Sequence, residues 1–271
     1  MSRLLRLDAT FLLALPAAMA VVALALSLEG GQLRILLQPS AALVVFGGTL
    51  VAVVFSFPVT LLLRTWRALA AAFGGSRPPD RVLLARIGEY ATRARQRGRL
   101  ALEGEVAGAG DPFLARAIAL VVDGVPAADV RHTLKAFSDA REEADSECAV
   151  VLEAAAGYAP TLGILGAVLG LMQAMANLAE PGRLGPAIAV AFVATVYGVG
   201  SANLVFLPLA MRLRGLCRTA ALNREVIIEG AVAIQQGMHP ALIDSHLRSL
   251  LAAWHGDAAA RAGRTAKLVT S

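Results

Sequence analysis

The sequence predicts an all-α membrane protein with four transmembrane helices in two hairpins, a helical cytoplasmic lobe between helices 2 and 3, and a cytoplasmic C-terminal helix. Two observations predict this class. The chain of 271 residues is 57% hydrophobic, and its mean hydropathy of +0.64 is too high for a soluble domain of this length. Its apolar residues also gather in four runs, and a helix crosses a bilayer with about 20 of them.

The four apolar runs occupy about residues 11–28, 41–63, 149–178 and 184–211. Short polar turns separate the first run from the second and the third from the fourth, so each pair is expected to form a tight hairpin. The chain then divides into an N-terminal transmembrane hairpin (1–63), a cytoplasmic helical lobe (64–148), a C-terminal transmembrane hairpin (149–211), and a cytoplasmic helix and tail (212–271).

The arginines predict the orientation of these segments. They precede the first run and follow the second and the fourth: Arg3, Arg6, Arg64, Arg67, Arg77, Arg81, Arg212, Arg214 and Arg218. By the positive-inside rule both termini and both long polar stretches are cytoplasmic. Arg3, Arg6 and the small residues Ala18-Met19-Ala20 also resemble a cleaved signal peptide. The three later apolar runs and the absence of a disulfide framework argue against a secreted protein.

Local signals also place two helices in and after the lobe. Asp111 and Pro112 predict a helix start, because Asp caps helices and Pro fits the first helical position. From Ala127 a charged helix is expected to run into the third apolar run without a break. The roughly eighty residues of the lobe make short helices and not an enzyme-sized core.

Ionisable residues are missing from the last two apolar runs. Neither the stretch from Ala154 to Leu178 nor that from Leu184 to Met211 contains a carboxylate, histidine, lysine or arginine. An ion route through a bilayer normally needs such a group. Glu153 is the nearest, but it lies at the predicted cytoplasmic margin, where we expect it to solvate the helix entry. If this chain lines a proton path, a second polypeptide must therefore supply the titrating group.

Small and hydroxyl-bearing residues predict how these two runs pack. Gly163, Gly166 and Gly170 share one helix face and would let a neighbouring helix approach closely. Hydroxyls and an amide in the fourth run, including Thr195 and Asn203, either bond between helices or hydrate a pore. Each run also carries a proline, and such prolines either act as joints or are simply tolerated.

Several segments in order resemble the flagellar stator subunit MotA and its sodium-type relative PomA. The resemblance extends from about residue 10 to 255. It is carried by the segments Ala94–Glu103, Asp111–Leu114, Val121–Gly124, Pro160-Thr161-Leu162-Gly163-Ile164-Leu165-Gly166, Leu184–Ala189, Ala194-Thr195-Val196-Tyr197-Gly198, Leu207–Ala210 and Glu229–Gly237.

The resemblance implies a motor subunit in the bacterial inner membrane, with five copies around two copies of a MotB-like partner. That partner has one membrane helix and a peptidoglycan-binding domain, and its aspartate would carry the ion. The lobe would push a FliG-like rotor protein. The matching positions are Pro160, Thr161, Ala167, Thr195 and Pro208 for the ion pathway, Gly163, Gly166, Gly170 and Gly198 for helix packing, and Arg95 and Glu103 for rotor contact.

Ala167 bears on the choice of ion. Sodium-type relatives carry threonine at this position, and a dehydrated sodium ion needs several oxygen ligands. Alanine there favours protons.

Two other functions remain open at this stage. An ExbB- or TolQ-type energiser shares the last two membrane helices, but it generally has one membrane helix before the lobe. A non-conducting membrane scaffold is the other alternative. The sequence has no phosphate-binding loop, nucleophile motif or metal-spaced histidines, so we expect no enzyme, cofactor or metal site. The dispersed basic residues match no nucleic-acid-binding motif.

Overall fold

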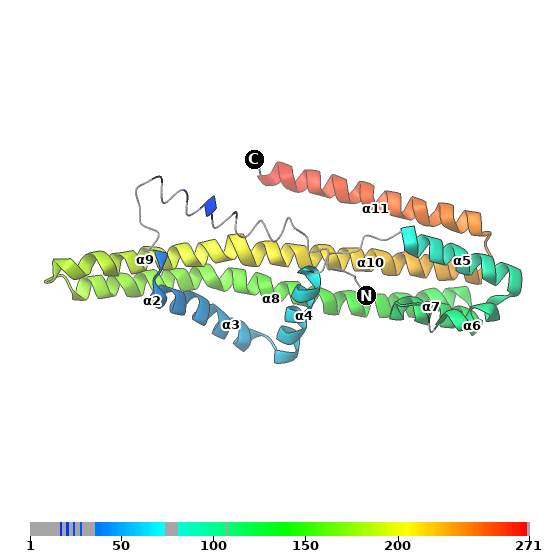
Figure 1. Ribbon diagram of the computed structural model, residues 1–271, viewed down its shortest axis with the longest axis horizontal. Helices are drawn as coiled ribbons and strands as arrows, with labels where there is room; N and C mark the ends of the chain where they lie inside the picture. Colours follow the sequence, from blue (N-terminus) through cyan, green and yellow to red (C-terminus); the bar gives the residue numbers. More distant parts are fainter. Residues whose placement is uncertain are drawn as a thin grey trace, which may run out of the picture. The chain divides into compact units, whose positions relative to one another are not determined.

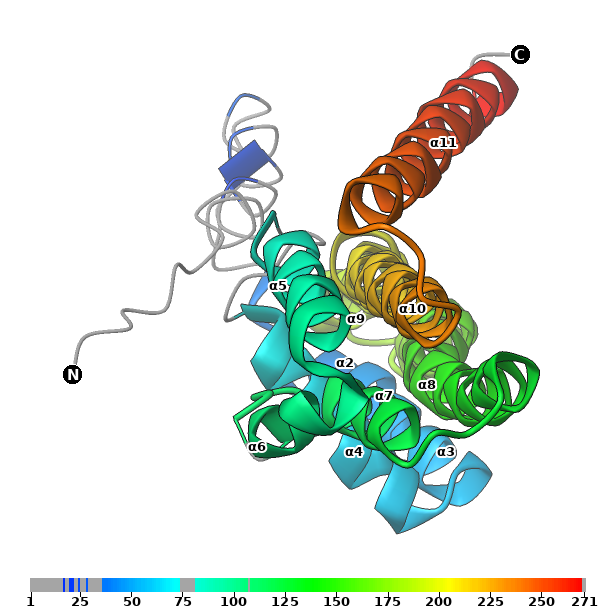
Figure 2. The same ribbon diagram turned by 90° about the vertical axis from the view of Figure 1, so that its right-hand side faces the viewer.

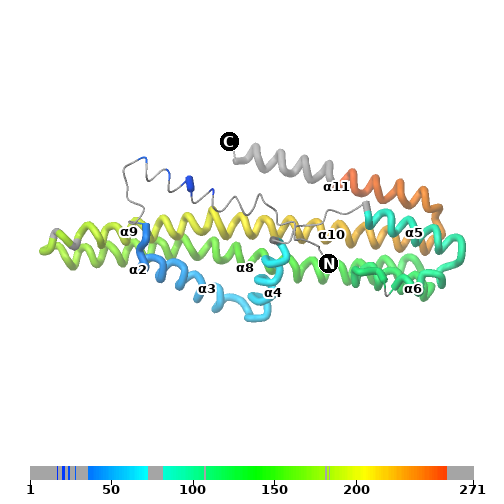
Figure 3. Tube along the Cα trace, in the orientation of Figure 1, coloured from blue at the N-terminus to red at the C-terminus, as the bar shows by residue number. Residues whose placement is uncertain are grey.

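The computed structural model describes residues 36–73, 81–106 and 108–269, together with five isolated residues between 17 and 28; side chains are described as far as Trp254, apart from a few positions. Figure 3 traces the chain through these segments. The first apolar run, at 11–28, otherwise lies outside the described residues, as does most of the turn after it.

Every regular element of the described residues is a helix. In chain order these are α2 (Pro39–Ala42), the π-helix η2 (Leu43–Gly47), α3 (Gly48–Ser56), α4 (Val59–Phe73), α5 (Arg81–Arg97), the 3₁₀ helix η3 (Arg99–Leu102), α6 (Glu103–Val106), α7 (Pro112–Val122), α8 (Ala127–Ala176), α9 (Pro181–Ser201), the π-helix η4 (Ala202–Phe206), α10 (Leu207–Gln235) and α11 (Pro240–Val269). Among the residues that the structure describes, three helical stretches are long and apolar enough to cross a membrane: Pro39–Ser56, Ala127–Ala176 and Leu184–Gln235.

The chain forms two compact units. One contains Met1–Ser76 and Glu143–Cys217, and the other contains Arg77–Glu142 and Arg218–Ser271. The two long polar stretches of the sequence therefore share one unit, and the helices α8 and α10 contribute residues to both.

The second apolar run is not one helix. The helix α3 ends at Ser56, and Phe57 has extended backbone angles of φ −131° and ψ 144°. Pro58 follows, and a proline disfavours the helical conformation of the residue before it. The helix α4 then begins at Val59, and its inner face packs on the cluster formed by Cys148, Ala149, Leu152, Ala210 and Leu213. Residues 64–73 therefore belong with the apolar helices and not with the lobe.

The signals for α7 and α8 are confirmed. The Asp111 carboxylate accepts a hydrogen bond from the Phe113 amide at 2.8 Å, and Pro112 occupies the first turn. The helix α8 runs unbroken from Ala127 to Ala176, through the internal Pro160.

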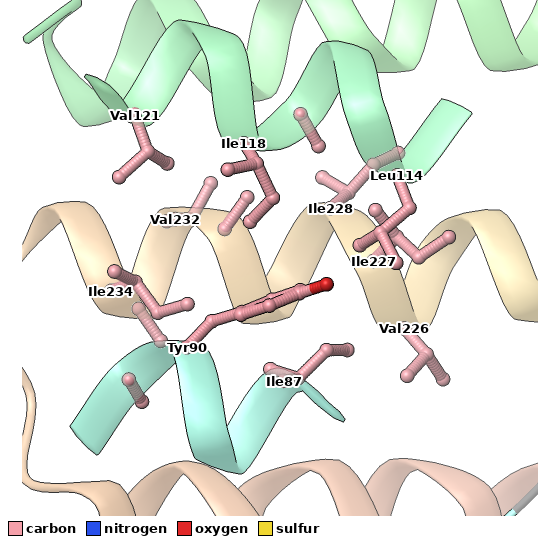
Figure 4. Close-up of a cluster of buried hydrophobic side chains, with 14 of the residues drawn as sticks. Ile87, Tyr90, Leu114, Ile118, Val121, Val226, Ile227, Ile228, Val232 and Ile234 are labelled. Carbon is pink, nitrogen blue, oxygen red and sulfur yellow. The ribbon is translucent and has the colours of Figure 1, made fainter. Parts of the chain in front are cut away.

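The second unit is built around the last half of α10. Figure 4 shows Leu114, Ile118 and Val121 of α7 on one side of this helix, and Ile87 and Tyr90 of α5 on the other. The buried cluster also includes Leu134 of α8 and Ile243 and Leu247 of α11. This burial raises the pKa of the Tyr90 hydroxyl, chiefly through desolvation.

An ion-pair cluster lies beside this core. Arg131 of α8 bonds to both oxygens of Glu229 on α10, and His246 of α11 lies 3.6 Å from Glu229 Oε2. The Glu229 side chain is only 14% exposed. The hydrogen bond from Arg131, followed by the contribution of His246, holds the pKa of Glu229 below its ordinary value despite its burial.

We expect Glu229→Gln to destabilise the second unit by about 1 kcal/mol at neutral pH, because Arg131 is half exposed and water screens the pair. Because folding lowers its pKa, the Glu229 carboxylate stabilises the folded state at pH values above its unfolded-state pKa of about 4.3. This stabilisation is lost as the pH falls through the folded-state pKa. The penalty should therefore shrink in acid, as measured by hydrogen exchange of α10 amides at about pH 7 and about pH 3. Asp244→Asn, at an exposed pair within α11, is the control and should change little. An equal penalty at both pH values would contradict the assignment.

Candidate ion pathway

The helices α8 and α9 lie side by side as an antiparallel hairpin, in contact through glycines (Figures 1 and 2). A Cβ atom added to Gly163 would lie 2.9 Å from the Ala194 carbonyl oxygen, and one added to Gly198 would lie 2.5 Å from that of Ala159. Cβ atoms at Gly166 and Gly170 would each come within 2.8 Å of α9. At Gly163, Gly170 and Gly198 backbone lies against backbone, and at Gly166 the close neighbour is the Ala194 Cβ atom. A side chain at any of the four would prevent this approach.

The helices α2 and α3, with η2 between them, cover one side of this hairpin. Leu162 of α8 packs on Gly48, and the Tyr158 hydroxyl hydrogen-bonds with the Ser56 hydroxyl at 2.9 Å. On α9, Tyr197 donates a hydrogen bond to the Leu36 carbonyl, and Val193 and Ala194 are buried against Ala41 and Val45.

The opposite side of the hairpin carries the proposed pathway residues. On α8, Pro160 and Ala167 are seven residues apart and therefore share one face. That face lies about a quarter turn from the glycine contact and about half a turn from Leu162. Thr195 occupies the corresponding face of α9, half-buried beside the helix seam. None of the α2–α3 contacts described above reaches these three residues.

Polar side chains near these residues bond to their own helices. Thr161 donates to the Tyr158 carbonyl at 2.8 Å, and Thr195 lies 3.4 Å from the Ala191 carbonyl. The Asn203 amide donates to the Val199 carbonyl at 2.9 Å. Hydroxyl oxygens that donate within their helix retain free lone pairs for water or an ion. The face is polar at these points and uncharged.

The two prolines have different local structures. Pro160 lies inside α8, which continues through it. Pro208 lies in the first turn of α10 and directly follows the π-helix η4. A π segment inserts one residue into a helix, and the missing amide of a proline removes another regular hydrogen bond. The sequence shows Pro208 itself, but nothing in it predicted the π-helix η4.

Two ion pairs lie at the cytoplasmic margin predicted from the sequence. Arg64 of α4 bonds to Asp145 of α8 at 2.8 Å. Arg214 of α10 bonds to Glu153 of α8 at 2.6 Å. Sequence reasoning assigned no partner to either carboxylate, because the pairs join residues 81 and 61 positions apart.

Arg95 and Glu103 belong to the second unit, whereas Pro160, Ala167 and Thr195 belong to the first. Both side chains are exposed. Arg95 lies in the last turn of α5, with its guanidinium 3.4 Å from the Gly237 carbonyl, and Glu103 begins α6. Within the part of the chain that the structure describes, no group of three His, Cys, Asp or Glu side chains could hold a metal ion.

Residues 106–226 match the MotA/TolQ/ExbB proton channel family. Motility protein A of Bacillus subtilis is 32% identical to this chain over 248 residues, which are 91% of this chain and 92% of the relative. Chemotaxis protein PomA of Vibrio alginolyticus is 34% identical over 90% of this chain and 96% of its own.

Solved structures give the same result. The structure of C. jejuni MotAB contains a chain 27% identical to this one, with a TM-score of 0.85 and coverage of 90% of this chain and 95% of that chain. The flagellar MotAB stator complex from Bacillus subtilis matches with a TM-score of 0.82 at 31% identity, over 89% of this chain and 95% of that chain.

The glycine contact gives a matched pair of substitutions on one helix. We expect Gly198→Ala to destabilise the hairpin by about 1–3 kcal/mol, because its Cβ meets backbone atoms of α8 that cannot move aside. Gly200→Ala meets nothing within 4 Å and should be neutral or slightly stabilising, since alanine favours helix. Thermal unfolding of both purified variants in detergent tests this. Equal midpoints would show that the close approach is not needed.

Proposed function

Because the chain belongs to the MotA/TolQ/ExbB proton channel family, we propose that it is the stator subunit of a flagellar motor. It is a membrane protein that forms an ion channel with a MotB-like partner and converts ion flow into torque. It is a channel subunit and not an enzyme. The observation that carries this conclusion is the match to motility protein A and PomA along nine-tenths of both chains.

The geometry of the C-terminal hairpin supports a channel in which this chain forms the wall and the partner supplies the titrating group. The open side of α8 and α9 is lined by Pro160, Ala167 and Thr195, and neither helix carries a charged group between residues 154 and 178 or between 184 and 211. A single helix of the partner, carrying an aspartate, would lie against this side. The Thr195 hydroxyl and polar backbone groups near the prolines would then solvate the ion. Alanine at position 167 offers no oxygen ligand there, which favours protons over sodium.

The finer features of the assembly are part of the same proposal. Five copies surround two partner helices in the bacterial inner membrane, with both termini in the cytoplasm. The first apolar run and Pro39–Ser56 form one transmembrane hairpin, and 149–178 and 184–211 form the other. The second unit, which carries Arg95 and Glu103, faces the cytoplasm and contacts a FliG-like rotor protein.

An ExbB- or TolQ-type energiser is the second candidate, because it falls in the same family. The relatives matched here argue for the stator. Motility protein A and PomA are covered almost entirely, including the region before the lobe in which two apolar runs occur. Mapping the amino terminus by cysteine labelling separates the two, since a hairpin before the lobe requires a cytoplasmic terminus.

We expect proton entry into cells only when this chain and a MotB-like partner are expressed together. Cytoplasmic acidification after an external acid pulse, in sodium-free buffer, measures the flux. Replacing the partner's aspartate with asparagine should abolish this flux, because this chain has no titrating group between residues 154 and 178 or between 184 and 211. Flux through this chain alone would overturn the proposal, and a requirement for sodium would overturn the choice of ion.

We expect a charge reversal at Arg95 or Glu103 to reduce swimming speed without changing proton flux. Both side chains are exposed charges in the unit that does not contain the pathway residues. Arg97→Glu, an exposed arginine two positions from Arg95, is the control for net charge. Tracking of swimming cells and the acid-pulse assay on the same strains separate the two effects. If flux and swimming fell together, these residues would act on the channel and not on the rotor.

A further inference from the structure

The ion pair between Glu153 and Arg214 joins the two helices that carry the proposed pathway. Arg214 Nη2 lies 2.6 Å from Glu153 Oε2, and the two side chains are 51% and 33% exposed. Partial exposure leaves the carboxylate accessible to water on the side that is not packed.

Glu153 lies on the open face of α8. It precedes Pro160 by seven residues and Ala167 by fourteen, so all three project from one stripe of the helix. The glycine face and the face covered by α3 lie on other sides. Glu153 is therefore the first carboxylate below Pro160 along this stripe, since residues 154–160 contain none.

Arg214 reaches the same side only because of the π-helix. It follows Thr195 by nineteen residues, one more than the eighteen that make five α-helical turns. The segment η4 at Ala202–Phe206 lies between them and takes up the extra residue. The π-helix thus brings Arg214 into line with Thr195, and the pair closes across the lower end of the open face.

The neighbouring ion pair does not share this placement. Asp145 of α8 bonds to Arg64 of α4, and the Asp145 carbonyl accepts a weak bond from the Cys217 thiol on α10. Asp145 lies eight residues before Glu153 and points from a different face of α8. The two pairs are similar in chemistry but differ in the helices they connect.

We propose that Glu153 is the proton-release group at the cytoplasmic end of the ion route and that Arg214 positions it. A proton arriving through water in the route bonds to the Glu153 carboxylate, and the hydrogen bond to Arg214 breaks. The same proton then passes to a water molecule of the cytoplasm, and the ion pair re-forms. This inference rests on the proposed function, because it needs a proton route between α8, α9 and the partner.

Two substitutions that both break the pair distinguish this role from a structural one. Glu153→Gln removes the acceptor, and proton flux should fall about tenfold or more. Arg214→Gln leaves the acceptor in place and removes only the group that positions it, so flux should fall by about threefold at most, because a half-exposed pair is weak. Flux is measured by the acid-pulse assay in cells that express the MotB-like partner, with the amount of co-purified partner as the measure of assembly.

Asp145→Asn and Glu153→Asp complete the set. Asp145→Asn breaks the neighbouring pair and should leave flux unchanged, whereas Glu153→Asp keeps a carboxylate and should recover most of it. Parental flux in Glu153→Gln, or equal losses in Glu153→Gln and Arg214→Gln, would overturn the inference while the stator function stood. If Glu153→Gln failed to assemble, a loss of flux in an assembled Glu153→Asp variant would overturn it as well. Absence of flux in the parent complex would instead overturn the proposed function.

Discussion

The close approach of α8 and α9 is the contact on which the rest of the apolar unit depends. Apolar side chains gain little by leaving lipid for protein, so membrane helices associate through close packing of small residues. Gly163 and Gly198 bring the backbones of the two helices together, and Gly166 and Gly170 continue the contact along α8. This fixes the rotation of each helix about its axis. With that rotation fixed, one side of the hairpin receives α2 and α3, and the other stays open.

The open side is consequently a property of the pair and not of either helix. Pro160 and Thr195 come from different helices and lie on one side because the glycine contact sets both rotations together. A charged residue beside Pro160, Ala167 or Thr195 would be costly in a membrane without a partner. None occurs between residues 154 and 178 or between 184 and 211, which agrees with a channel whose titrating group belongs to a second protein. The second unit is held together differently. It buries a large apolar core and pairs its charges at the edge, as at Arg131 and Glu229.

Local patterns in the sequence predicted the elements whose causes are local. The cap at Asp111 and the unbroken helix from Ala127 follow from residues within a few positions of one another. The break at Phe57 has a local signal as well, the following Pro58, but the apolar run across it hid the boundary. The joining of two distant polar stretches into one unit has no local signal. It depends on packing of α10 against α5 and α7, which only the folded chain reveals.

In the candidate pathway, too, some features could be predicted from the sequence and others could not. Spacing alone placed the glycines on one face of α8, whereas Pro160 and Ala167 were singled out by the resemblance. The role of Glu153 could not be read from the sequence, because its partner lies 61 residues away and beyond a π-helix. In a regular α-helix Arg214 would be turned about 100° from Thr195, and a sequence-based helical wheel puts it there. One inserted residue corrects this angle, so a local irregularity decides whether the carboxylate of α8 meets a cation at the mouth of the route.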